Sequence, residues 1–267
     1  MHLSYKTRGL RSNPPLLLLH GFLGSATDWL LLCNNLGNDF YLIVLDLPGH
    51  GESADIDSNE VNPDPLISIH SLINNVLKRL SLKKVTLLGY SLGGRIAMGY
   101  ALAHSNNINS LIIEAAHPGL KNDEEKKARA ISDEYWCNRF CSEAYDLVLY
   151  DWYCQSVFKD ISDNDRQQLI IERLVGLTAC SVANVLTSYS LSKQPDYSEW
   201  LSVAPFPVHY LCGENDKAFS HIGKQLNKAG CLQSLHCIGG AGHNVHRERP
   251  EKVAAIIRTL YQLPLKT

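Results

Sequence analysis

The chain has 267 residues, of which 45% are hydrophobic and 19% are charged. This composition is typical of a soluble globular protein with a sizeable core. The net charge of -2 gives no reason to expect nucleic acid or an anionic membrane as a partner.

The N-terminal region has only four consecutive leucines, at residues 16–19. This run is too short for the core of a signal peptide and far too short to span a bilayer. We therefore expect a cytoplasmic protein without membrane insertion.

The first half of the chain is predicted to alternate buried strands with helices. Apolar runs bounded by proline or glycine predict strands, and apolar residues at helical spacing predict helices. The predicted strands cover residues 16–19, 41–45, 85–88 and 110–114, and the predicted helices cover 26–36, 66–80 and 94–103, with an exposed loop at 55–65. This alternation predicts a mostly parallel sheet with helices on both faces, the α/β class.

The second half begins with a change of pattern. Residues 121–193 show helical spacing, no clear strand and many aromatic residues. We interpret this segment as a helical cap inserted into a core formed by residues 1–120 and 194–267, because ligands bind at the carboxyl ends of parallel strands. Further strands are predicted at 207–212 and 234–238, and a last helix at 250–260.

One short turn carries the strongest chemical signal. Gly89-Tyr90-Ser91-Leu92-Gly93 stands between a predicted strand and a predicted helix, and this is the nucleophile-elbow pattern of the α/β-hydrolase fold. Only glycines allow the strand and the helix to approach so closely. The Ser91 hydroxyl would then lie at a helix N-terminus, which favours negative charge.

Asp216 and His243 follow the last two predicted strands. The order serine, acid, histidine is the order of the α/β-hydrolase triad, in which the acid orients the imidazole and the imidazole takes the serine proton. Glu214 and His246 are nearby competitors. The backbone N–H groups of Phe22 and Leu92 are expected to bind a developing oxyanion.

Two other polar groups have a structural explanation. Asp46 and His50 form a possible acid–base pair, but the proline and glycines between them already predict a compact turn. His20 precedes the predicted oxyanion loop, and we expect it to shape that loop rather than to titrate.

The cysteines and histidines give no sign of a metal. The eight cysteines are scattered without a Cys-x-x-Cys pair, so we expect buried free thiols rather than zinc ligands or a disulfide framework. The histidines show no spacing such as His-x-x-x-His beside acidic partners. We therefore expect neither a metal nor any other cofactor.

Five stretches together resemble one family of enzymes. Residues 89–95, 114–120, 151–153, 211–214 and 242–248 read GYSLGGR, EAAHPGL, DWY, LCGE and GHNVHRE. They are similar to the 2-succinyl-6-hydroxy-2,4-cyclohexadiene-1-carboxylate synthases of menaquinone (vitamin K2) biosynthesis. The resemblance implies a lyase that eliminates pyruvate from 2-succinyl-5-enolpyruvyl-6-hydroxy-3-cyclohexene-1-carboxylate, with the triad as the base and no acyl-enzyme.

The substrate that this resemblance implies is a small molecule with several carboxylates, which requires cations in the site. Arg95 lies one turn into the predicted elbow helix. The resemblance further implies Arg129 and Arg173 as carboxylate clamps, and Tyr90 and Trp152 as hydrogen-bonding and packing groups. Lys217 is a further possible anion contact.

Two other functional classes share these features. A carboxylesterase or a carbon–carbon bond hydrolase would use the same triad, and a binding module would use the fold without chemistry. Several arginines around the pocket favour the multi-anionic substrate over an ester. We expect a monomer or a small homo-oligomer.

Overall fold

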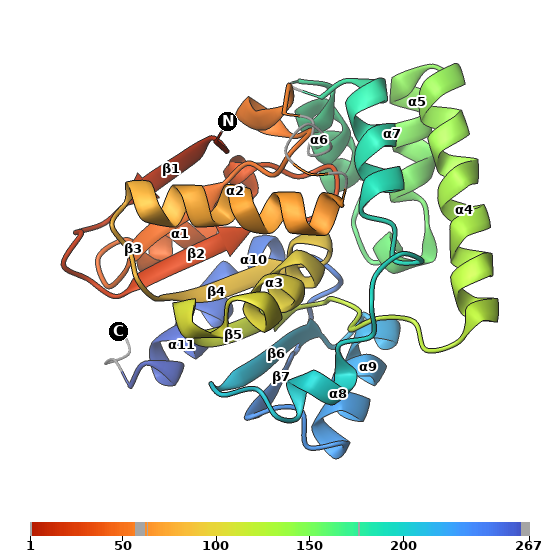
Figure 1. The fold of residues 1–267 in the computed structure, drawn as a ribbon. Coiled ribbons are helices and arrows are strands. Elements are labelled where there is room, and N and C mark those ends of the chain that lie inside the picture. The colour runs from red at the N-terminus through yellow and green to blue at the C-terminus, as the bar shows by residue number, and fades with distance from the viewer. Residues whose placement is uncertain (1, 57–61, 63, 176, 263–267) are drawn as a thin grey trace.

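The computed structural model describes residues 2–56, 62, 64–175 and 177–262 (Figure 1). Within them lies a seven-stranded sheet with the strand order β1-β3-β2-β4-β5-β6-β7. The strands are β1 (Tyr5–Arg8), β2 (Pro15–Leu19), β3 (Tyr41–Leu45), β4 (Val85–Tyr90), β5 (Ile108–Glu114), β6 (Val208–Gly213) and β7 (Ser234–Ile238). Only β1 is antiparallel to its neighbour, so the mostly parallel α/β sheet is confirmed.

The sheet is buried on both faces because successive side chains of a strand point to opposite sides. In β2, Leu17 and Leu19 join one core cluster, whereas Leu16 and Leu18 join another. Helices α2, α3, α8 and α9 contribute to the first cluster, and α1, α10 and α11 contribute to the second. Their bounds are α1 (Leu30–Leu36), α2 (Pro65–Arg79), α3 (Leu92–Ala103), α8 (Ser198–Leu201), α9 (Lys217–Lys228), α10 (Val245–Glu248) and α11 (Pro250–Leu260).

The predicted strands and helices of the core all form, with small shifts at their ends. The helix expected at 26–36 begins as the 3-10 helix η1 (Ala26–Trp29). The sequence pattern does not predict β1, because YKTR has no apolar run and this strand lies at the sheet edge with largely exposed side chains. Part of the loop expected at 55–65 lies outside the described residues.

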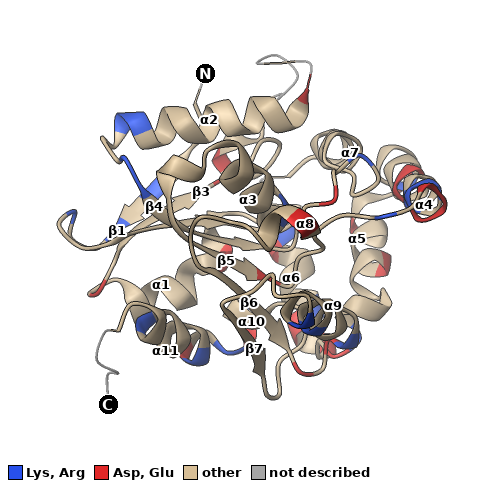
Figure 2. Ribbon diagram, turned by 60° about the horizontal axis from the view of Figure 1, so that its bottom comes forward, with Lys and Arg blue, Asp and Glu red and all other residues tan. Residues whose placement is uncertain are grey.

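Helix α2 illustrates how charge at the ends supports a helix. Its N-cap residue Asp64 accepts hydrogen bonds from the N–H groups of Leu66 and Ile67. Lys78 and Arg79 occupy its last turn, so opposite charges lie at its two ends (Figure 2). Acidic groups near the N-terminus and basic groups near the C-terminus interact favourably with the helix dipole, and both therefore stabilise the helix.

Four helices, α4 to α7, form a group of their own between β5 and β6. They are α4 (Asp123–Ser142), α5 (Tyr145–Tyr153), α6 (Asp163–Leu174) and α7 (Ala179–Ser188), and Figure 1 shows them together beyond one end of the sheet. Their buried side chains, among them Phe140, Val148 and Val182, pack into a third cluster that also includes Leu23 of the core. No strand is found among the described residues of this segment, although the domain boundaries at 121 and 193 stay a prediction.

The eight cysteines all carry free thiols. Three of them, Cys33, Cys212 and Cys231, are buried as expected. The expectation of burial is wrong for four others, which lie on the exposed side of a helix or strand or, for Cys154, just after the end of α5. These exposed residues are Cys141, Cys154, Cys180 and Cys237.

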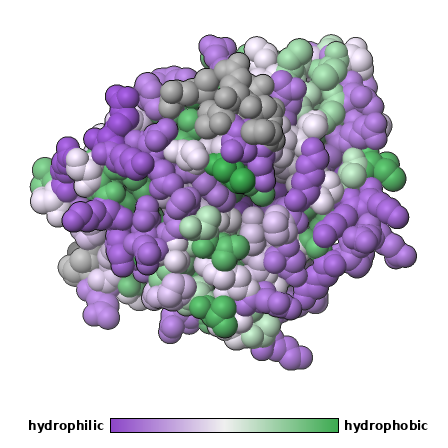
Figure 3. Space-filling view, in the orientation of Figure 1, coloured by the Kyte–Doolittle hydropathy of each residue, from purple (hydrophilic) through white to green (hydrophobic). Residues whose placement is uncertain are grey.

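The surface is mixed in character. The face seen in Figure 3 is mostly hydrophilic, and its hydrophobic residues form separate small groups. Among the described residues, no single helix has both the length and the apolar character needed to cross a membrane. Only the bent pair α6 and α7 together passes such a test of length and composition.

Candidate active site

Ser91 sits in the strained turn that the sequence predicts. It joins β4 to α3 with φ of 50° and ψ of -109°, a conformation that is costly for any residue with a side chain. Its N–H donates to the Glu114 carbonyl oxygen of β5 at 2.9 Å. A Cβ at Gly89 would lie 2.3 Å from the Gly93 oxygen, and one at Gly93 would lie 2.2 Å from the Leu19 oxygen, so both glycines are required.

The acid and the histidine of the predicted triad meet at the ends of β6 and β7. His243 Nδ1 donates to Asp216 Oδ2 at 2.6 Å, and both side chains are almost fully buried. The second oxygen of Asp216 accepts from the Phe219 N–H at the start of α9. The hydrogen bond from His243 Nδ1 to Asp216 fixes the imidazole tautomer with Nδ1 protonated, which leaves Nε2 as the base.

The two competing residues are engaged elsewhere. His246 is fully buried and its Nδ1 lies 2.9 Å from Glu114 Oε1, whereas Glu214 is exposed. Within the described residues the Ser91 hydroxyl makes no hydrogen bond to His243. The structure therefore joins Asp216 and His243 directly, and the contact between His243 and Ser91 stays a prediction. Catalytic hydrogen bonds are often long before substrate binds and shorten in the complex.

The predicted oxyanion hole consists of two backbone donors. Leu92 is the first residue of α3, where an N–H has no partner inside the helix. Phe22 lies in the turn 21–25 after β2. No hydrogen bond from either N–H is found in the part of the chain that the structure describes, so both remain able to bind an oxyanion.

Three polar side chains hold that turn in place. His50 Nε2 accepts from the Leu23 N–H at 3.2 Å, and His20 Nε2 accepts from the Leu47 N–H at 3.0 Å. Asp46 accepts from the Ala26 N–H at 2.6 Å. These bonds bear out the structural interpretation of all three residues, and Asp46 and His50 form no acid–base pair.

The burial of His20 and His50 predicts how the free energy of unfolding depends on pH. Burial lowers the pKa of His20 to about 4 and that of His50 to about 3, from an ordinary value of 6.5. The unfolded chain therefore binds more protons below pH 6.5, so stability is full above that pH and declines as the pH falls toward 4. We expect each histidine to account for a loss on the order of 3 kcal/mol at pH 4.

Urea unfolding between pH 7 and pH 4 measures this effect. In His50→Gln the amide oxygen can still accept from Leu23, but no imidazole titrates. The variant should lose less stability than the wild type over this range. An equal loss in both proteins would contradict the assignment of His50.

A cavity of about 100 Å³ lies between the core and the cap, beside Ser91. Six of the predicted site residues line it: Phe22, Ser91, Leu92, Arg95, Arg129 and Trp152. The sequence reasoning missed the other six, which are His117, Val185, Leu186, Tyr189, Leu191 and Phe219. His117 belongs to the EAAHPGL stretch, so the resemblance could have identified it as a cavity residue. The apolar residues carry no local signal of such a role.

Arg95 is the most unusual charge in this cavity. Its guanidinium donates only to neutral oxygens, Gln194 Oε1 at 3.1 Å and the Tyr189 carbonyl at 2.7 Å, and it has no ion pair among the described residues. Burial, together with the nearby Arg129 cation, lowers the pKa of Arg95 to about 9. A partly buried cation without a carboxylate partner is costly and is suited to an anionic ligand.

Other predicted residues have partners of their own or lie outside the cavity. Arg129 lines the cavity but also donates to Asp133 at 2.8 Å. Tyr90 lies below the cavity, where its ring packs between His243 and His246. Lys217 is exposed and bonds to the Glu214 carbonyl oxygen.

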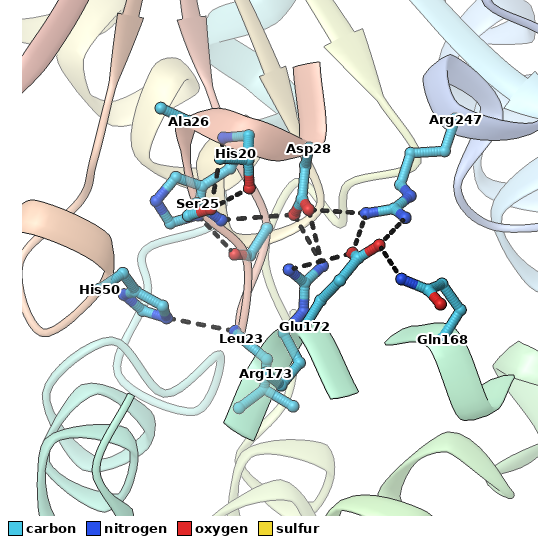
Figure 4. Close-up of polar contacts among 12 residues, drawn as sticks. His20, Leu23, Ser25, Ala26, Asp28, His50, Gln168, Glu172, Arg173 and Arg247 are labelled. Atoms are coloured by element: carbon cyan, nitrogen blue, oxygen red, sulfur yellow. Dashed lines mark hydrogen bonds and ion pairs between the residues drawn. The ribbon is translucent and has the colours of Figure 1, made fainter. Parts of the chain in front are cut away.

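Arg173 does not reach the cavity. It is almost fully buried, and its Nη2 donates to both carboxylate oxygens of Asp28 at 2.8 Å (Figure 4). Its Nε donates to the Tyr153 hydroxyl at 3.2 Å. The structure therefore does not bring Arg173 together with the other predicted carboxylate clamps. No group of His, Cys, Asp or Glu that could hold a metal is found among the described residues.

Comparison with known proteins places this geometry in a family. The family described as alpha/beta hydrolase fold matches residues 14–250. The 2-succinyl-6-hydroxy-2,4-cyclohexadiene-1-carboxylate synthase of Enterobacter sp. (strain 638) is 37% identical over 267 residues, covering 100% of this chain and 99% of that protein. The synthase of the same name from Photorhabdus laumondii is 38% identical and covers 97% of this chain and 89% of its own length.

Among solved structures, MenH from S. aureus superposes with a TM-score of 0.87 at 26% identity, covering 98% of both chains. The match extends over the cap helices as well as the sheet, because so little of either chain lies outside it. The chain belongs to the family of 2-succinyl-6-hydroxy-2,4-cyclohexadiene-1-carboxylate synthases, built on the α/β-hydrolase fold.

Proposed function

We propose that this enzyme eliminates pyruvate from 2-succinyl-5-enolpyruvyl-6-hydroxy-3-cyclohexene-1-carboxylate and forms 2-succinyl-6-hydroxy-2,4-cyclohexadiene-1-carboxylate in menaquinone biosynthesis, in the cytoplasm. The observation that carries the proposal is Arg95, a partly buried cation whose hydrogen bonds go only to neutral oxygens in the cavity beside Ser91. A substrate with several carboxylates supplies the missing negative charge. An ester without a carboxylate does not.

The proposed reaction begins with removal of a ring proton. Asp216 holds the His243 tautomer, and Nε2 takes the proton through the Ser91 hydroxyl. The electron pair moves into the neighbouring carbonyl, whose oxygen is stabilised by the N–H groups of Phe22 and Leu92. The electron pair then returns from the carbonyl oxygen into the ring, a second ring double bond forms, and the bond from the ring to the enolpyruvyl oxygen breaks with its electrons left on that oxygen. The released enolate takes up a proton and becomes pyruvate.

The cations bind the substrate rather than react with it. Arg95 and Arg129 both line the cavity, one on the elbow helix α3 and the other on the cap helix α4. Trp152, on α5, packs against Phe22 with ring centroids 4.9 Å apart. We propose that a carboxylate bound by both arginines draws the cap and the core together.

Substrate entry requires the cap to move. The cavity of about 100 Å³ is smaller than the roughly 300–1,000 Å³ of typical small-molecule sites. Because Arg129 and Trp152 belong to the cap, a displacement of α4 and α5 away from the core enlarges it.

Pyruvate release from freshly generated substrate tests the proposal, with a model ester assayed in parallel. We expect rapid pyruvate release and little ester cleavage. Ester cleavage without pyruvate would leave the triad in place but would favour the alternative, a carboxylesterase or a carbon–carbon bond hydrolase.

A further inference from the structure

Four charged side chains form a cluster beside the turn 21–25, and Figure 4 shows them converging. Asp28 is at its centre and is 3% exposed. Besides Arg173, it accepts a hydrogen bond from Arg247 Nη1 at 2.8 Å. Arg247 also donates to Glu172 at 2.9 Å and 3.2 Å, so the cluster contains two cations and two carboxylates.

The members of this cluster come from three distant segments. Asp28 lies in η1, directly after the turn that carries Phe22. Glu172 and Arg173 lie at the end of cap helix α6, and Arg247 lies on α10, which follows His243. One carboxylate therefore connects the oxyanion turn, the cap and the segment of the catalytic histidine.

Asp28 also shapes the turn itself. Its Oδ2 accepts from the Ser25 N–H at 3.3 Å, and the Ser25 hydroxyl completes a capping box for η1. A Cβ at Gly24 would lie 2.6 Å from the same oxygen, so the turn packs directly on the carboxylate. The position of the Phe22 N–H, two residues earlier, depends on this packing.

The cluster keeps Asp28 charged. Burial alone would raise the pKa of this carboxyl, but the Arg173 and Arg247 cations outweigh it and hold the pKa below its ordinary value. A neutral amide in its place can still accept from Ser25. It removes the carboxylate that accepts two hydrogen bonds from the buried Arg173, however, and such a change is strongly disruptive, whereas Arg247 keeps its bonds to Glu172.

We propose that Asp28 is a positioning residue for the oxyanion hole, and that Arg173 of the cap holds it in place. The docking of α6 through Arg173 then sets the turn that carries Phe22, which lines the same cavity as Ser91. The inference rests on the proposed function only for the choice of substrate, because the oxyanion hole serves any chemistry of this triad.

Asp28→Asn tests this role, with Asp39→Asn as the matched control. Asp39 accepts from Arg258 Nε at 2.9 Å, in a pair with 19% and 8% exposed side chains that ties α11 to the segment before β3. It lines no part of the Ser91 cavity. Both substitutions remove a carboxylate from a mostly buried ion pair, so both are expected to lower Tm.

The decisive readouts are kcat, KM and the affinity for an aryl boronic acid. The Ser91 oxygen adds to boron, its proton passes to His243, and one boron-bound oxygen occupies the oxyanion hole. Removing an oxyanion donor costs about 10²–10³ in kcat, so displacing one should cost about tenfold. We expect Asp28→Asn to lower kcat and boronate affinity about tenfold each with KM changed less than about threefold, and Asp39→Asn to leave all three unchanged.

Arg173→Gln removes the cap cation that pairs with Asp28 and leaves Asp28 paired with Arg247. This variant provides a second test if Asp28→Asn does not fold. It should lower kcat and boronate affinity in the same direction. Variants with a lower Tm but wild-type kcat and boronate affinity would overturn the positioning role. Because boronate binding does not involve the lyase substrate, a failure of the proposed function alone would appear only in pyruvate release.

Discussion

Replacing Ser91 by alanine is expected to lower kcat for pyruvate release by about a thousandfold, within the range typical of general acid–base catalysis. His243→Ala should lose a similar factor. The hydroxyl relays the proton to His243, and Asp216 holds the imidazole at 2.6 Å in the tautomer that can accept it. Both losses follow from removing one part of the same relay.

The measurement is initial-rate pyruvate release, coupled to NADH oxidation by lactate dehydrogenase. Ser110→Ala is the matched control, because this serine lies on the neighbouring strand β5 and donates to the Pro207 carbonyl oxygen outside the cavity. It should retain wild-type kcat. Melting temperatures of all variants show that each protein is folded.

The double variant Ser91→Ala with His243→Ala distinguishes a relay from two separate roles. Residues that act as a unit lose little more together than singly. The double variant should therefore be no slower than the slower single variant by more than about threefold. A near-normal kcat in Ser91→Ala with a full loss in His243→Ala would mean that the imidazole takes the ring proton directly.

The elbow and the pairing of Asp216 with His243 could be predicted because their physical constraints leave local marks in the sequence. The contact between Gly93 and the Leu19 oxygen requires glycine, and the buried strand β6 that precedes Asp216 is visible as an apolar run. The strand β1 left no such mark, because its edge position exposes its side chains.

The charge cluster could not be predicted because its partners are far apart in the chain. The resemblance identifies Arg173 as functional, but no local pattern reveals that Asp28, 145 residues away, accepts its hydrogen bonds. Arg129 is different, because its partner Asp133 lies only one helical turn along α4, a spacing at which side chains of a helix meet. An arginine that could bind a carboxylate is visible in the sequence, but the packing of the folded chain decides which carboxylate it contacts.

Arg95→Met is expected to lower kcat/KM about a hundredfold, mainly through KM. The fold-change corresponds to about 3 kcal/mol, the upper range for a hydrogen bond to a charged group. In the free enzyme the guanidinium meets only the oxygens of Gln194 and Tyr189, so a substrate carboxylate is its first partner of opposite charge. Arg95→Lys keeps the charge but loses the planar fork and should recover only part of the loss.

Arg139→Met is the matched control for the loss of an arginine. Arg139 pairs with Glu143 and Asp151 on the cap and lines no part of the Ser91 cavity. Its replacement should leave KM unchanged. Because Arg95 also bonds to the Tyr189 carbonyl oxygen of the cap segment, the melting temperature of Arg95→Met separates a loosened cap from a lost substrate contact.

The pH dependence gives a second test of Arg95 in the unmodified enzyme. Its pKa of about 9 means that the cation is present at neutral pH and is lost as the pH rises through 9. Since kcat/KM reports the groups of the free enzyme, it should decline above about pH 9 in the wild type and in Arg139→Met. The decline should be absent from the residual activity of Arg95→Met. If that variant keeps the same alkaline decline, or if its KM equals that of the wild type, Arg95 is not the group that binds the substrate carboxylate.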